Sequence, residues 1–172
     1  FYPVYEFTKQ VAGDTANVKL LIGAGTEPHE YEPSAKAVAT IQDADAFVYE
    51  NENMETWVPK LLKTLKKDKV NVVKASGKML LLPGTEEEED HEHGEEGHHH
   101  DYDPHVWLSP KRAIQMVEHI RDSLSKAYPE KKAAFEKNAA AYIKKLEALD
   151  KEFEDGLANA KLKSFVTQHA AF

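Results

Sequence analysis

The chain has 172 residues, of which 41% are hydrophobic and 30% are charged, and this composition is typical of a globular protein rather than a disordered or fibrous one. Its 30 acidic residues outnumber 22 basic ones, giving a net charge of −8, which argues against a general nucleic-acid-binding role. The sequence contains no cysteine, so disulfides, thiolate metal sites and cysteine nucleophiles are excluded. No apolar stretch approaches the ~20 residues that cross a bilayer.

Helices and strands alternate through the first half of the sequence. Ser34 is a good N-cap for one of these helices. The periodicity predicts helices over 3–12, 35–44 and 54–67, and strands over 18–22, 46–49 and 70–73. Strands that alternate with helices in this way indicate βαβ units and a parallel sheet, hence the α/β fold class.

The middle of the chain breaks this pattern. Residues 84–102 hold five consecutive acids and no apolar periodicity, so we expect a flexible surface loop. Ser109-Pro110 is then typical of a helix start, and it predicts a helix to about residue 126. A longer helix is predicted over 129–159 from an apolar stripe at helical spacing, followed by a strand over 164–167.

The two ends of the sequence do not read as natural termini. The chain opens on Phe1-Tyr2-Pro3 without an initiator Met, and no signal peptide pattern is present. It closes directly after the strand predicted at 164–167. We therefore expect a mature or trimmed protein that is cut off at its C-terminus.

Three of the nine histidines lie outside both the predicted helices and the acidic loop. His29 follows the first predicted strand, His169 follows the last one, and His105 stands between the loop and a helix, beside Pro104. Ligands of open α/β sheets bind beyond the carboxyl ends of strands, so the sequence predicts a three-histidine metal site. The alternative is that each is an ordinary solvated histidine, as we expect for His119 within the helix over 110–126.

The acidic loop is itself rich in histidine. Five imidazoles fall within ten residues, at His91, His93, His98, His99 and His100. Clustered imidazoles bind zinc or copper, and we expect weak, rapidly exchanging metal binding here. The alternative is a solubilising insertion in which the acids and histidines have no ligand.

The sequence lacks the motifs of several common enzyme and nucleotide-binding sites. The segment His91-Glu92-His93-Gly94-Glu95 does not have the metalloprotease spacing, and Gly23-Ala24-Gly25 lacks the third glycine of a dinucleotide-binding loop. The sequence contains no Walker-type loop and no nucleophile with an evident base. We therefore expect a protein that is not an enzyme.

Three segments carry a resemblance to a known family. They are Thr26-Glu27-Pro28-His29-Glu30-Tyr31-Glu32-Pro33, Asp103-Pro104-His105-Val106-Trp107-Leu108-Ser109-Pro110 and Phe165-Val166-Thr167-Gln168-His169-Ala170-Ala171-Phe172. They resemble the ligand motifs of the metal-binding solute-binding proteins of ABC transporters (the cluster A-I family). The resemblance covers essentially the whole chain and is closest to the zinc-binding lipoproteins of Gram-positive bacteria.

The resemblance implies a two-lobed α/β protein with metal bound between the lobes. Residues 1–128 would form the N-terminal lobe, 129–159 the rigid helix between the lobes, and 160–172 the start of a truncated second lobe. The family's fourth ligand, a carboxylate, would lie beyond Phe172. Without the rest of that lobe, the strand predicted at 164–167 would lack sheet partners.

The resemblance also implies the metal and the function. Manganese-binding relatives have Glu where this chain has His169, and three imidazoles suit Zn²⁺ better than manganese. We therefore expect a monomeric, extracytoplasmic zinc receptor that delivers Zn²⁺ to an ABC permease, attached to the surface of a Gram-positive cell by a lipid anchor outside this chain, or free in a periplasm. The alternatives are a zinc hydrolase with a His₃ site and an activated water, a manganese receptor of the same fold, and an adhesin or interaction module in which the histidines are incidental.

Overall fold

The structure is a computed structural model that describes residues 1–23, 25–66, 69–79, 103–162, 164–167 and 171. The α-helices are α1 (Tyr2–Ala12), α2 (Ala35–Gln42), α3 (Val58–Leu62), α4 (Pro110–Ala127) and α5 (Lys132–Leu157). The strands are β1 (Ala46–Tyr49) and β2 (Asn71–Lys74), and single 3₁₀ turns occur at η1 (Gly13–Thr15), η2 (Val106–Leu108) and η3 (Pro129–Lys131). No described helix combines the length and the apolar character that a bilayer span needs.

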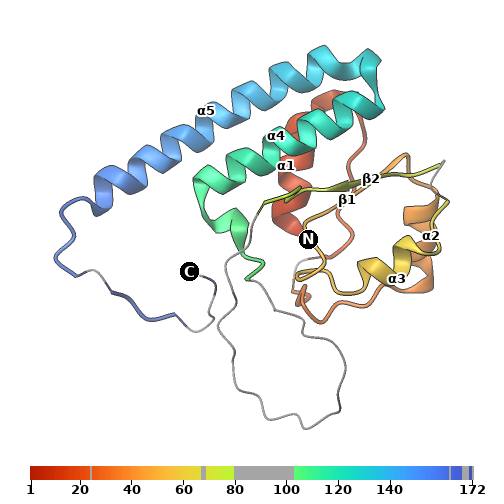
Figure 1. Cartoon of the computed structure of the whole chain (residues 1–172), viewed down its shortest axis with the longest axis horizontal. Coiled ribbons are helices and arrows are strands. Elements are labelled where there is room, and N and C mark those ends of the chain that lie inside the picture. The colour runs from red at the N-terminus through yellow and green to blue at the C-terminus, as the bar shows by residue number, and fades with distance from the viewer. Residues whose placement is uncertain (24, 67–68, 80–102, 163, 168–170, 172) are drawn as a thin grey trace, which may run out of the picture.

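The two strands form a parallel pair that separates two apolar cores. Their register pairs Ala46 with Asn71 and Tyr49 with Lys74. Figure 1 shows α1, α4 and α5 on one side of the strands and α2 and α3 on the other. Alternate side chains of β1 face opposite sides: Phe47 and Tyr49 join the core with α2 and α3, and Ala46 and Val48 pack against the other core. The α/β class predicted from the sequence is confirmed.

Most of the predicted elements are confirmed within a few residues. The helix expected at 3–12 is α1, which ends where Gly13 adopts a φ of 54°. The helix expected at 35–44 is α2, and its Ser34 cap is confirmed because the Ser34 hydroxyl accepts a hydrogen bond from the Ala37 amide, 3.2 Å away. The strands expected at 46–49 and 70–73 are β1 and β2, and the helix expected at 110–126 is α4.

The helix predicted over 54–67 is much shorter than expected. Asn51 Oδ1 accepts the backbone N–H groups of Asn53 and Met54, an Asx turn that competes with helix formation. Pro59 then fits only in the first turn of a helix, and α3 begins at Val58. The pattern of apolar residues was read correctly, but the turn chemistry before it was missed.

The strand predicted over 18–22 is not a strand, and this expectation is wrong. Leu20, Leu21 and Ile22 line a cavity of about 980 Å³ together with Phe47 and Val48 of β1. The segment therefore borders β1 without pairing with it, and the sheet of the described residues has two strands. Only Ile22 of this run is buried, and Val18, Leu20 and Leu21 are partly exposed. An apolar run therefore does not by itself show strand pairing.

The long helix predicted over 129–159 is confirmed as the turn η3 followed by α5. Only part of its apolar stripe is covered, however. Phe135, Ala139 and Leu146 are buried against α1 and α4, whereas Leu149, Phe153 and Leu157 are 41%, 52% and 65% exposed. Figure 1 shows this second half of α5 extending away from the other helices.

The strand predicted over 164–167 is wrong for these residues, which have no strand pairing. Phe165 and Val166 are 75% and 99% exposed. Without a neighbouring strand, the backbone has no ladder to join. The flexible loop predicted at 84–102 lies outside the described residues.

Candidate metal centre

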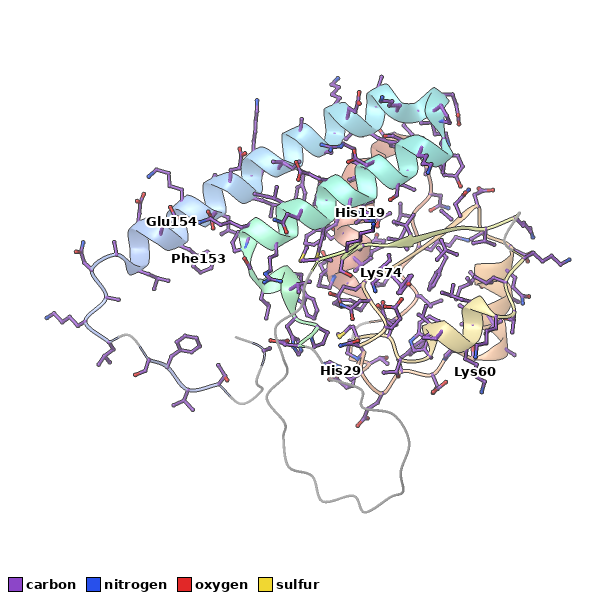
Figure 2. The ribbon with its side chains drawn as sticks, in the orientation of Figure 1. His29, Lys60, Lys74, His119, Phe153 and Glu154 are labelled. Atoms are coloured by element: carbon purple, nitrogen blue, oxygen red, sulfur yellow. The ribbon has the colours of Figure 1, made fainter. Side chains whose placement is uncertain are left out.

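Two of the three predicted ligands come together. The ring centroids of His29 and His105 are 5.3 Å apart, with 60° between the ring planes. His29 lies in the loop that leads into α2, and His105 immediately precedes η2. Figure 2 shows the His29 side chain well apart from His119, which lies on α4. Residues 76 positions apart in the sequence thus meet at one point.

The spacing of the two rings fits a shared zinc ion. A zinc–nitrogen bond of ~2.0–2.1 Å puts an imidazole centroid about 3.2 Å from the metal, and two such rings at a tetrahedral angle have centroids about 5.2 Å apart. The observed 5.3 Å is close to this value. The distance between the two rings therefore allows both to bind one ion.

Asp103 fixes the orientation of the His105 ring. Its Oδ1 lies 2.6 Å from His105 Nδ1 and also accepts the His105 backbone N–H at 2.9 Å. A carboxylate only accepts, so Nδ1 carries the proton, and Nε2 is the ring nitrogen that can bind a metal. The His105 side chain is 9% exposed, and its ring lies 5.2 Å from that of Trp107. Trp107 in turn packs edge-on against Phe1, 4.7 Å away.

His29 is supported differently. Its backbone N–H donates to Glu27 Oε1 at 3.2 Å, a contact that is exposed to solvent. Two residues later, the Tyr31 ring packs edge-on against Trp57, with centroids 5.7 Å apart and planes at 69°. The loop is thus tied to the core through an aromatic side chain next to the ligand.

A buried acidic group lies near the His105 side of the site. Glu50 follows β1 and is fully buried, and neither of its carboxyl oxygens has a hydrogen-bond partner among the described residues. Burial raises the pKa of Glu50 to about 9, and the nearby carboxylates of Glu55 and Asp103 add to this rise. Burial also raises the pKa of Glu55, to about 7. Glu50 is therefore a neutral acid at pH 7.

The other histidines of the chain do not add a described ligand to the His29–His105 pair. His169 and the loop histidines His91, His93, His98, His99 and His100 lie outside the described residues. Within the described part of the chain, no three His, Asp or Glu side chains are grouped closely enough to hold a metal. His119 is exposed on α4, and its ring lies over Gly77, as expected of an ordinary surface histidine.

The supporting roles of Glu27, Tyr31 and Asp103 were missed in the sequence, although a signal was present. The segments Glu27-Pro28-His29-Glu30-Tyr31 and Asp103-Pro104-His105-Val106-Trp107 share one pattern. In each, an acid stands two residues before the histidine, a proline precedes it directly and an aromatic residue follows two positions later. Both acids accept the backbone N–H of the histidine, and both aromatic side chains pack on another aromatic ring.

Comparison with known proteins shows which family the chain resembles. The chain matches a family model over residues 1–172, which is described as ZnuA, the periplasmic component A of a zinc-uptake complex. It is 81% identical, over its whole length, to the zinc-binding lipoprotein AdcA of Streptococcus pneumoniae. It is 49% identical to the high-affinity zinc uptake system protein ZnuA of Bacillus subtilis.

Solved structures agree with these matches. The whole chain superposes on Zn(II)-bound AdcA of Streptococcus pneumoniae with a TM-score of 0.88 and 74% identity. It superposes on the Zn(II)-bound ZnuA-like domain of that protein with a TM-score of 0.89 and 73% identity, covering 59% of the domain. The chain spans 34% of the length of the pneumococcal AdcA sequence and 54% of the Bacillus ZnuA sequence. The match of the family model along the entire chain shows that this protein belongs to the ZnuA family of zinc-uptake components.

Proposed function

We propose that the full-length protein is an extracytoplasmic receptor that captures Zn²⁺ and delivers it to an ABC permease. The observation that carries the proposal is the His29–His105 ring pair at 5.3 Å, with His105 Nδ1 held by Asp103. Imidazole ligands of this kind suit zinc. The relatives reported above are named for zinc binding or uptake, which favours a receptor over a hydrolase, a manganese receptor or an adhesin.

Two further ligands would complete the proposed zinc site. His169 would supply the third imidazole, and a carboxylate beyond Phe172 the fourth ligand. His91, His93, His98, His99 and His100 would bind zinc weakly and concentrate it near the site. The full-length protein would bind one tight ion as a monomer and perform no reaction.

We further propose two lobes, with residues 1–128 as the first, 129–159 as the connecting helix and 160–172 as the start of the second. The exposed stripe on α5 supports this division, because Leu149, Phe153 and Leu157 present apolar surface without cover in the described residues. A longer relative has additional chain that could cover it. The receptor would be held at a Gram-positive cell surface by a lipid anchor, as the name of the pneumococcal lipoprotein suggests.

Zinc titration of the full-length protein tests the site. We expect His29→Ala, His105→Ala and His169→Ala each to weaken tight binding by about 100-fold or more, since each removes one zinc ligand. Chelator competition measures the affinity. His119→Ala is the matched control, because that exposed histidine on α4 should leave the affinity unchanged.

Deletion of residues 86–101 should remove the additional, weakly bound zinc ions and leave the tight site intact. Undiminished tight binding in all three ligand variants would refute the proposed site.

A further inference from the structure

The loop that carries His29 has few internal means of holding its shape. No residue from Gly25 to Pro33 is buried. Three of its hydrogen bonds join near neighbours: the Thr26 amide donates to the Gly23 carbonyl, the Tyr31 amide to the Pro28 carbonyl, and the His29 amide to Glu27. Such local bonds shape a turn but do not fix where the turn sits relative to the core.

Tyr31 supplies that connection. It is the loop's aromatic residue, and it packs against the apolar core formed with α2 and α3. Its partner Trp57 is 5% exposed and also contacts Phe47 of β1, with ring centroids 5.9 Å apart. The Trp57 carbonyl also accepts the Leu61 amide in the first turn of α3, so both the side chain and the backbone of Trp57 are held in place. The contact of the Tyr31 ring with Trp57 therefore holds the loop at a fixed place relative to α3 and β1.

The position of this contact matters for the ligand. Tyr31 is two residues from His29, so a shift of its ring moves the His29 backbone. The imidazole of His29 must stay near its 5.3 Å spacing from the His105 ring for both to reach one ion. A ligand held in place before the metal arrives loses less conformational entropy on binding.

We propose that Tyr31 is a positioning residue for the zinc site, which holds His29 in its ligating position by packing edge-on against Trp57. This inference rests on the proposed function. The contribution comes from the ring rather than the hydroxyl group, because the contact with Trp57 is aromatic. Tyr31 touches no metal and acts only through His29.

The test compares zinc affinities of the full-length protein by chelator competition. Tyr31→Ala should weaken zinc binding roughly tenfold, the lower end of what loss of a supporting residue costs a metal site. Tyr31→Phe should restore the affinity to within about twofold of wild type. Tyr31 is partly exposed on a surface loop, so the alanine variant should fold.

A matched control separates positioning from general stability. Tyr142 is also half-buried, and its ring packs on Phe7 at 6.1 Å in the other core, on α5. Tyr142→Ala should lower the melting temperature of the metal-free protein about as much as Tyr31→Ala does, with zinc affinity unchanged. Cobalt(II) absorption adds a second readout: saturated Tyr31→Ala should keep the intense visible bands of a tetrahedral site, since all ligands remain, whereas His29→Ala should lose them.

The outcomes distinguish the two proposals. If His29→Ala weakens binding but Tyr31→Ala binds zinc as tightly as wild type, the positioning role is wrong and the site stands. If Tyr31→Phe is as weak as Tyr31→Ala, the ring contact is not the cause and the inference fails. If His29→Ala leaves the affinity unchanged, the proposed site itself is wrong.

Discussion

The two histidines of the pair are held by different kinds of contact, although their sequence motifs are alike. His105 has a polar support, because Asp103 binds both its ring and its backbone amide. Glu27, at the matching position before His29, accepts the backbone amide of His29 in a contact that is exposed to solvent. His29 depends instead on the packing of Tyr31 against Trp57. The same spacing of acid, proline, histidine and aromatic residue thus supports one histidine mainly by hydrogen bonds and the other mainly by aromatic packing.

Burial explains this difference. The His105 side chain is 9% exposed, and Asp103 beside it is 31% exposed. A charge-assisted hydrogen bond gains strength where water is scarce. Glu27 is exposed, so its hydrogen bond competes with water and contributes little. In the loop of His29, apolar contact is the interaction that still stabilises a fixed geometry.

The largest expected effect is on the pH dependence of stability, and it concerns Glu50. This buried acid lies beside Asp103, and no described residue has the same place beside Glu27. Burial raises the pKa of Glu50 from 4.5 to about 9, so between these values the unfolded chain releases a proton that the folded chain keeps. The contribution of Glu50 to the free energy of unfolding should therefore be complete below pH 4.5 and fall as pH rises toward 9, by up to about 1.4 kcal/mol per pH unit. Glu50→Gln should flatten this slope and be more stable than wild type at pH 8, measured by urea unfolding.

Two features sharpen that measurement. The groups that face Glu50 are Glu55, Asp103, Lys74 and the amino group of Phe1. Burial also raises the pKa of Glu55, to about 7, so a smaller slope should remain in Glu50→Gln. Glu52→Gln is the control, because Glu52 is a part-exposed partner of Lys74 and such pairs contribute about 1 kcal/mol or less. An unchanged slope in Glu50→Gln would contradict the assignment of a buried neutral acid.

The next effect in size tests the two motif acids against each other. Asp103→Asn should weaken zinc binding about 10–100-fold, because an amide at this position no longer enforces the Nδ1–H tautomer of His105. Glu27→Gln should change the affinity less than twofold, since its backbone contact is exposed. Chelator competition on the full-length protein measures both. Equal effects of the two substitutions would show that the two acids support their histidines to the same extent.

Much of this arrangement was accessible from the sequence, for identifiable reasons. The spacing of apolar residues predicted α1 and α5, because a helix buries one face. His29 and His105 were predicted as ligands from strand ends, prolines and the family resemblance, and the structure brings their rings together. Serine at the start of α2 and of α4 was read correctly, since a hydroxyl before a helix caps free amides.

The parts that the sequence did not predict depend on contacts between distant residues. The run at 18–22 is apolar because it borders a cavity beside β1, and pairing cannot be read from apolar character. The support of His29 by Trp57 joins residues far apart in the chain. The burial of Glu50 was also hidden, because a glutamate in a polar run next to a strand looks like a surface residue until the fold encloses it.

The smallest expected effect compares the serine caps that follow the two ligand loops. Ser109 accepts the Arg112 amide at the start of α4, and Ser34 accepts the Ala37 amide at the start of α2. Ser109→Ala should lower the free energy of unfolding by about 1 kcal/mol, because α4 is central to the larger core and cannot fray without exposing it. Ser34→Ala should cost about 0.5 kcal/mol, since only Ile41 of α2 is buried. Urea unfolding measures both, and a larger loss for Ser34→Ala would mean that the His29 loop depends on its helix more than on Tyr31.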